Sequence, residues 1–206
     1  MLKAFFDTEK LSVKLGMIFS HIGLSPNAWT VLAIIPAILG FVSLVTYHSL
    51  LWGLVFFLAS GVIDAIDGAV ARVTSRVSAM GAFLDGVIDR YVEFLLYLGL
   101  MFFLMDGGPV FLVPSYVWIN ILLFGAIMPT LIRAYADHRK VVTDQGDLRR
   151  MGGLLERAER LALLYVGLLL GIQNILWLVY IVAAAAILAN FTAFQRLWFV
   201  FRYKAE

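Results

Sequence analysis

Long apolar segments follow one another along almost the whole of this chain. A membrane-spanning helix needs about 20 predominantly apolar residues, and six segments approach or exceed that length. They cover residues 27–47, 51–73, 78–105, 110–134, 158–175 and 177–199. Because a bilayer provides no water for backbone hydrogen bonds, such segments can cross it only as helices or as strands of a closed barrel. Segments this long predict an all-α integral membrane protein with six transmembrane helices.

Composition agrees with a membrane protein. The chain is 62% hydrophobic, whereas soluble domains are about 45–50% apolar. It contains no cysteine, which excludes disulfides, thiolate metal sites and thiol catalysis. No linker or repeat interrupts the chain, so we expect one membrane domain over residues 1–206, with a six-helix bundle at residues 26–201.

The segment before the first span has a different pattern. Residues 5–22 alternate apolar and charged positions, which predicts an amphipathic helix lying in the membrane interface within residues 1–25. Ser25 suits a helix N-cap and Pro26 a first helical position. The first membrane helix is therefore expected to begin at Pro26.

Positive charge is distributed unevenly around the six segments. Of the 16 Lys and Arg residues, all but Arg90 and Arg196 lie near the chain termini or the even-numbered loops. The odd-numbered loops contain none. Cytoplasmic loops of membrane proteins carry an excess of Lys and Arg. We therefore expect a multi-pass protein of the cell membrane with both termini in the cytoplasm.

Four aspartates interrupt the second and third apolar segments: Asp64, Asp67, Asp85 and Asp89. An ionised carboxylate in hydrocarbon costs several kcal/mol unless it is paired, hydrated or bound to a metal. Residues three or four apart share one face of a helix, and the short loop between the segments predicts antiparallel neighbours. At about 1.5 Å per residue, all four acids lie roughly 10–16 Å from the cytoplasmic boundary. We therefore expect them to converge on one pocket open to the cytoplasm.

A hard divalent cation explains four acids at one depth better than structural ion pairs do. Arg72 and Arg90 are the arginines nearest to these acids in sequence, and unpaired carboxylates would repel one another. Carboxylate oxygens suit Mg²⁺ or Mn²⁺, and Mg²⁺ commonly completes its coordination with substrate phosphate. Small residues between the acids would let a ligand approach the backbone, although they also suit ordinary helix packing. The prediction is a metal site for a phosphate-bearing ligand.

One spacing in this region resembles the signature of the CDP-alcohol phosphotransferase family at every fixed position: Asp64-x2-Asp67-Gly68-x2-Ala71-Arg72-x8-Gly81-x3-Asp85-x3-Asp89. The six-span plan and the amphipathic N-terminal segment also look like that family. The resemblance implies an enzyme in which an alcohol displaces CMP from a CDP-linked lipid. It implies that the four aspartates bind Mg²⁺ or Mn²⁺, as two ions, and that Asp89 is also the general base for the acceptor hydroxyl.

The same resemblance implies which residues contact the CDP-lipid. They are Asn27, Ala28, Trp29 and Thr30 at the foot of the first span, and Gly68, Ala71, Arg72, Ser78 and Gly81 in and beside the signature. Many members of the family are homodimers, so a second copy of the chain is an expected partner. The other expected partners are the lipid bilayer and the two substrates, and no nucleic acid.

Four basic residues outside the signature are candidates for binding a second phosphate: Lys140, Arg157, Arg160 and Arg196. Arginine side chains suit phosphate oxygens, although each residue taken singly also fits the membrane boundary. Their spacing looks like that of the inositol-phosphate-using branch of the family. This resemblance implies transfer of a phosphatidyl or archaetidyl group to inositol phosphate.

Other functions stay open at this stage. Glycerol 3-phosphate also carries a phosphate and is the alternative acceptor, and CDP-inositol is the alternative donor. Intramembrane acids also line ion pathways, so a divalent-cation transporter is an alternative from another class. A transporter needs acids reachable from both faces, whereas the outer halves of the predicted spans are apolar. A purely structural membrane protein explains the four acids least well.

Overall fold

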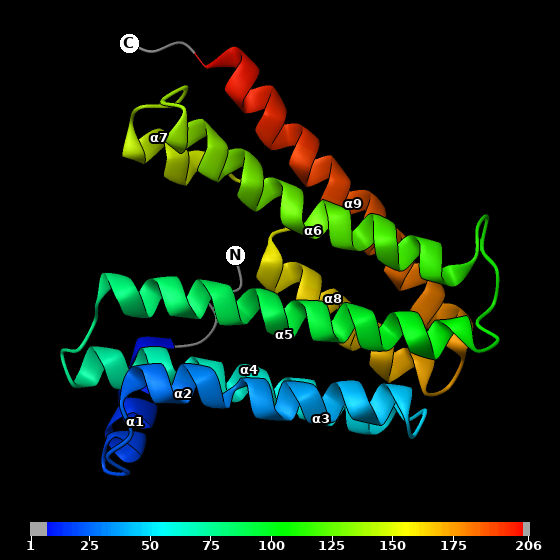
Figure 1. Cartoon of the computed structure of the whole chain (residues 1–206), viewed down its shortest axis with the longest axis horizontal. Coiled ribbons are helices and arrows are strands. Elements are labelled where there is room, and N and C mark those ends of the chain that lie inside the picture. The colour runs from blue at the N-terminus through cyan, green and yellow to red at the C-terminus, as the bar shows by residue number, and fades with distance from the viewer. Residues whose placement is uncertain (1–7, 204–206) are drawn as a thin grey trace. The chain divides into compact units, whose positions relative to one another are not determined.

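The computed structural model describes residues 8–203. Within that range the chain is helical, which confirms the all-α class (Figure 1). The helices are α1 (Thr8–Ser20), α2 (Pro26–Leu32), α3 (Ile34–Val45), α4 (Leu50–Val73), α5 (Ala79–Met105), α6 (Ser115–His138), α7 (Gln145–Arg150), α8 (Arg157–Gly171) and α9 (Ile175–Arg202). The part of the predicted interfacial helix that precedes Thr8 lies outside the described residues.

The chain divides into two compact units, and the boundary between them in the sequence falls within α5. The first unit ends at Gly99 and the second begins at Leu100. The first therefore holds α1 to α4 with most of α5, and the second holds α6 to α9. One membrane domain over residues 1–206 stays a prediction.

Four helical segments among the described residues are long and apolar enough to cross a membrane. They are Pro26–Val45, which combines α2 and α3, and the helices α4, α6 and α9. The 27-residue helix α5 is long enough, but charged side chains interrupt it, Glu93 among them. The helix α8 has 15 residues, about 22 Å, against a hydrocarbon core about 30 Å thick. By length and composition, residues 8–203 thus contain four helical segments typical of a membrane protein.

The first predicted span is divided into two helices. Ser25 caps α2, its Oγ accepting a hydrogen bond from Ala28 N at 3.2 Å, and Pro26 opens the helix as predicted. The helix then breaks at Ala33. Pro36 has no N–H to donate to the carbonyl four residues earlier, that of Leu32, so the backbone ladder is interrupted at that point.

Small residues hold the helices of the first unit at short distances. Leu44 of α3 is fully buried and contacts Gly53 of α4 and Gly99 of α5. A Cβ at either glycine would lie 2.7 or 2.8 Å from the Leu44 methyl carbons. Ser60 of α4 also donates a 2.7 Å hydrogen bond to Ala33 O. These contacts hold α3 against both of the helices that carry the acids.

The helix α1 lies against α4 in the same unit. Gly16 allows this approach, because a Cβ there would lie 2.5 Å from both Ala69 O and Val73 Cγ2. The side of α1 away from α4 is apolar and exposed, with Ile18 63% accessible and Val13 48%. One side of α1 is therefore packed on α4 and the other exposes apolar side chains.

In the second unit, α9 packs against both α6 and α8. Gly125 of α6 lies against Asn190 of α9, whose Nδ2 donates a 2.9 Å hydrogen bond to Ile121 O. Gly167 of α8 lies against Leu178 of α9 in a similar close contact. This helix trio supports the segment that carries the predicted basic residues.

Candidate functional site

The helices α4 and α5 bring three of the four predicted aspartates together. Carboxylate oxygens of Asp64, Asp67 and Asp85 all lie within 4.8 Å of one another. We call these residues the three-aspartate cluster. Its oxygens come from positions three apart on α4 and from the first turns of α5, as the helical spacing predicted.

Asp67 is the most buried member of the cluster and has an unsatisfied oxygen. The residue is 7% exposed, and its Oδ2 has no hydrogen-bond partner. A buried carboxylate oxygen without a partner is unfavourable. A hard divalent cation satisfies such an oxygen and relieves repulsion among three carboxylates at once. The donor set therefore fits a divalent metal ion, as the sequence predicted.

Asp89 lies one helical turn beyond Asp85 on α5 and is half-buried. It is near enough to Asp67 for the two carboxylates to interact electrostatically, but it is not part of the three-aspartate cluster. Asp89 is thus close to the clustered acids without belonging to the group of three. Its predicted roles as metal ligand and general base stay predictions.

A cavity of about 410 Å³ borders the cluster; we call it the cluster cavity. It is lined by the start of α2, the C-terminal half of α4, the connecting loop and the first turns of α5. The lining residues are Pro26, Asn27, Thr30, Asp67, Gly68, Ala71, Arg72, Arg76, Val77, Ser78, Gly81, Ala82 and Asp85. The cavity thus brings together most of the residues that the sequence assigned to the CDP-lipid.

Four of the lining residues were not among the predicted site residues: Pro26, Arg76, Val77 and Ala82. Helical spacing could have indicated Ala82, which lies four residues after Ser78 and so on the same face. The charge of Arg76, in the loop between the two acid-bearing segments, was a second available signal.

Arg72 reaches the cavity by folding back along its own helix. A Cβ on Gly68, one turn earlier, would lie 3.3 Å from Arg72 Nη1, so glycine leaves room for the guanidinium. Arg72 Nη2 donates a 2.7 Å hydrogen bond to Ser12 Oγ of α1. The arginine is therefore held at the cavity wall by a contact outside the signature.

Ser78 and Gly81 shape the opposite wall at the start of α5. Ser78 Oγ accepts a 3.0 Å hydrogen bond from Gly81 N. A Cβ on Gly81 would lie 3.2 Å from both Asn27 Oδ1 and Ser78 Oγ. Glycine at this position therefore lets two polar side chains lie close together on the cavity wall.

Trp29 and Ala28, which the sequence also assigned to the CDP-lipid, do not line the cluster cavity. Trp29 is 8% exposed and packs with Ile66 and Val70 of α4. Its ring also meets Phe19 of α1 edge to face, at 5.5 Å between ring centres. Adjacent helical residues point in different directions, so Thr30 can face the cavity while Trp29 packs in the core.

The predicted basic residues lie in the second unit and differ in burial. Arg160 is 2% exposed and Arg196 6%, whereas Arg157 is half-buried at the start of α8. Arg196 Nη2 contacts both carboxylate oxygens of Glu156 at 2.8 Å, and its Nη1 donates to Pro129 O at 2.8 Å. The sequence interpretation missed Glu156, although this acid directly precedes Arg157.

Lys140 has a different environment from the arginines. Its side chain is 71% exposed and its Nζ lies 3.4 Å from Asp137 Oδ1 of α6. Its backbone adopts φ +56° just after the end of α6. Lys140 is thus an exposed residue of a turn, in a contact with its own neighbour.

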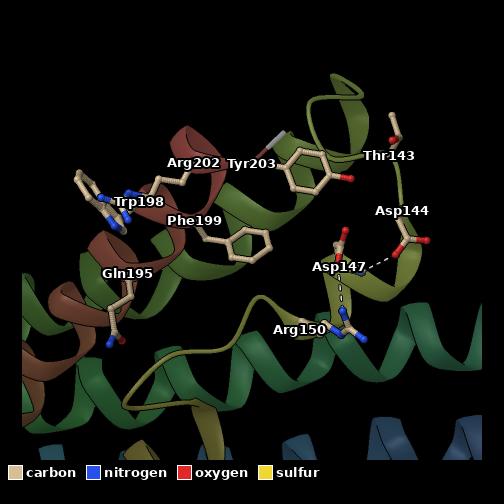
Figure 2. A pocket seen from close by; sticks show the side chains of 9 residues that line it. All are labelled: Thr143, Asp144, Asp147, Arg150, Gln195, Trp198, Phe199, Arg202 and Tyr203. Atoms are coloured by element: carbon tan, nitrogen blue, oxygen red, sulfur yellow. Dashed lines mark hydrogen bonds and ion pairs between the residues drawn. The ribbon is translucent and has the colours of Figure 1, made fainter. Parts of the chain in front are cut away.

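A second cavity, of about 730 Å³, lies between the α7 segment and the C-terminal end of α9 (Figure 2). Its lining includes the ion pair between Asp147 and Arg150, 3.6 Å apart. Arg202 stacks over the Trp198 ring at 4.6 Å on the α9 side. None of the predicted site residues lines this cavity. Its charged side chains, of both signs, contact other residues of the same cavity wall.

A family model described as CDP-alcohol phosphatidyltransferase matches residues 23–197. An archaetidylinositol phosphate synthase of Aeropyrum pernix is 27% identical over 97% of this chain and 94% of the relative. An archaetidylinositol phosphate synthase of Pyrococcus horikoshii is 30% identical over 90% of this chain and 88% of the relative.

Solved structures show the same fold. The crystal structure of Mycobacterium tuberculosis phosphatidylinositol phosphate synthase with CDP-DAG bound matches with a TM-score of 0.77, covering 94% of each chain at 24% identity. A structure of the same synthase in complex with manganese and citrate matches with a TM-score of 0.78, at 23% identity over 93% of this chain and 89% of that chain.

Proposed function

This chain belongs to the CDP-alcohol phosphatidyltransferase family, and we propose that it transfers the phosphatidyl or archaetidyl group of a CDP-linked lipid to inositol phosphate, releasing CMP. The observation that carries the proposal is the three-aspartate cluster beside a cavity walled by Gly68 and Arg72. The names of the relatives, which are inositol-phosphate synthases, support the acceptor.

The metal-binding residues in this proposal are Asp64, Asp67 and Asp85. The unsatisfied Oδ2 of Asp67 supports this assignment, and Asp89 completes a second site when two ions are bound. Mg²⁺ or Mn²⁺ bound by these residues would neutralise the pyrophosphate and stabilise charge on the departing CMP. A related synthase holds manganese in a solved structure.

The cluster cavity is the proposed site of the CDP group. Its volume of about 410 Å³ lies within the range of small-molecule sites, about 300–1,000 Å³. Arg72 supplies a planar, permanently charged group for pyrophosphate oxygens, and Gly68 lets that group approach the helix backbone. Asn27, Thr30 and Ser78 supply neutral polar groups to the same cavity.

Asp89 is the proposed general base. The acceptor hydroxyl oxygen forms a bond to the lipid-side phosphorus while the bond from that phosphorus to the CMP oxygen breaks. The Asp89 carboxylate takes the hydroxyl proton in the same step. Its place as the last acid of the signature, one helical turn beyond Asp85 on α5, supports this role.

Lys140, Arg157, Arg160 and Arg196 are the proposed ligands of the acceptor phosphate. Arg157 and Arg160 support this role best, because they lie three apart in the first turns of α8 and so share one face. Arg196 already contacts Glu156, whose backbone carbonyl also accepts from Arg160 N. This contact ties Arg196 to the start of α8.

We further propose that α5 and α8 complete a six-span arrangement with cytoplasmic termini. The uneven distribution of Lys and Arg supports this orientation. The acids of α5 distinguish this helix from an ordinary apolar span. Metal binding would neutralise their negative charge within the membrane. The active site would then open to the cytoplasm, where CDP-activated lipids and phosphorylated polyols can reach it, and the protein would act as a homodimer.

The direct test is CMP release by the purified protein given a CDP-lipid and Mg²⁺, with inositol phosphate, glycerol 3-phosphate, inositol and serine compared as acceptors. Release that depends on inositol phosphate is the expected result. Release with glycerol 3-phosphate alone would keep the reaction class and refute the acceptor. No release with any acceptor, from a folded protein that binds Mg²⁺, would refute the transferase assignment. The alternative would then be a divalent-cation transporter, which cation flux in sealed vesicles would test.

A further inference from the structure

Arg72 is held by a residue of α1, far from the signature in sequence. Its Nη2 donates to Ser12 Oγ at 2.7 Å, while its Nη1 lies over Gly68. Arg72 also lines the cluster cavity. Among the described residues, Ser12 therefore accepts from one of the five N–H donors of a guanidinium that also borders the cavity.

The position of α1 is fixed by two further contacts. Gly16, one turn after Ser12, lies directly against the Ala69 carbonyl of α4. Phe19 packs edge to face on Trp29 of α2 at 5.5 Å. Ser12, Gly16 and Phe19 lie at spacings of four and three residues, so they form one face of α1. This face holds the Ser12 hydroxyl at one place beside α4.

We propose that Ser12 is a positioning residue for Arg72, and through it a determinant of affinity for the CDP-lipid. The proposal rests on the proposed function of Arg72 as a pyrophosphate ligand. A free arginine side chain has many rotamers and loses conformational entropy when it is fixed. The hydrogen bond to Ser12 fixes the guanidinium before the ligand arrives, so less of this entropy is lost on binding.

The test compares Ser12→Ala with Ser12→Thr, which keeps a hydroxyl, and with Ser20→Ala. Ser20 is a matched control because its hydroxyl donates to Met17 O of the same helix. The measurements are KM for the CDP-lipid, kcat at saturating acceptor, and affinity for CDP in the presence of Mg²⁺. A net hydrogen bond of ordinary strength predicts a roughly three- to tenfold rise in KM and loss of CDP affinity for Ser12→Ala.

Ser12→Thr and Ser20→Ala are expected to match the wild type, and kcat of Ser12→Ala to change by less than about twofold. In an Arg72→Ala background, Ser12→Ala is expected to have no further effect, because the two residues act through one interaction. A structural role of α1 alone would lower kcat, or would persist in that background.

Unchanged KM and CDP affinity in Ser12→Ala would overturn this inference and leave the proposed function standing. An equal loss with and without Arg72 would overturn it as well, since Ser12 would then act by another route. Absence of CMP release from the wild type with any donor and acceptor would refute the proposed function, and this inference with it.

Discussion

Replacing Asp67 by asparagine tests whether the three-aspartate cluster is a metal site. Without a cation, three carboxylates lie within 4.8 Å of one another. At that distance and an effective dielectric constant of about 20, each pair of unit charges repels by about 3.5 kcal/mol. Asp67→Asn removes two of the three pairs while keeping the shape of the side chain. Proton uptake and solvent screening reduce the gain, so we expect about 1–3 kcal/mol more stability without metal.

The assay is thermal unfolding of the purified protein in detergent, with EDTA and across a Mg²⁺ titration. The expected gain corresponds to a rise in Tm of about 2–12 °C in EDTA, at about 2–4 °C per kcal/mol. The wild type is expected to gain stability as Mg²⁺ is added, and Asp67→Asn to lose most of that gain. Asp147→Asn is the matched control, because Asp147 lies outside the cluster and pairs with Arg150.

A lower Tm of Asp67→Asn in EDTA, together with an intact response to Mg²⁺, would refute this reasoning. Such a result would mean that the buried Asp67 carboxylate is stabilised by protein groups and that the cation binds elsewhere. A change of the same size in Asp147→Asn would show that net charge, and not the cluster, sets the response.

Three further substitutions test other parts of the site. Gly81→Ala places a methyl group 3.2 Å from Asn27 Oδ1 and is expected to raise KM for the CDP-lipid several-fold, measured by CMP release, with little change in Tm. Glu156→Gln removes the charge opposite Arg196. Since Glu156 is 43% exposed, we expect a loss of about 1–2 kcal/mol in urea or thermal unfolding. Asp89→Asn is expected to abolish turnover but to keep CDP binding in the presence of Mg²⁺, and near-normal turnover would refute its role as base.

Much of the helical framework follows from local sequence. The predicted segments 51–73 and 78–105 match α4 (Leu50–Val73) and α5 (Ala79–Met105) within a residue at each end, because apolar length and polar breaks determine both. The short helix α7 was not predicted, since it lies in a polar run without apolar periodicity. The break at Ala33 was missed too, although Pro36 carried the signal for it.

Part of the candidate site can also be predicted from the sequence, and part of it cannot. Convergence of Asp64, Asp67 and Asp85 follows from helical spacing and a short loop, and both can be read from the sequence. The hydrogen bond from Arg72 to Ser12 joins residues 60 positions apart, and that from Arg196 to Glu156 joins residues 40 apart. Such pairs depend on how helices pack against one another, which no local pattern encodes.

The boundary at Gly99 and Leu100 separates the residues that we propose for two different chemical tasks. Every residue assigned to the metal or the CDP group precedes it, and every residue assigned to the acceptor phosphate follows it. Under this proposal, changes confined to the residues after Gly99 would alter the acceptor. The residues before Leu100, which bind the metal and the CDP group, would stay the same. Chimaeric chains joined in the middle of α5 offer a direct way to transplant acceptor preference between relatives.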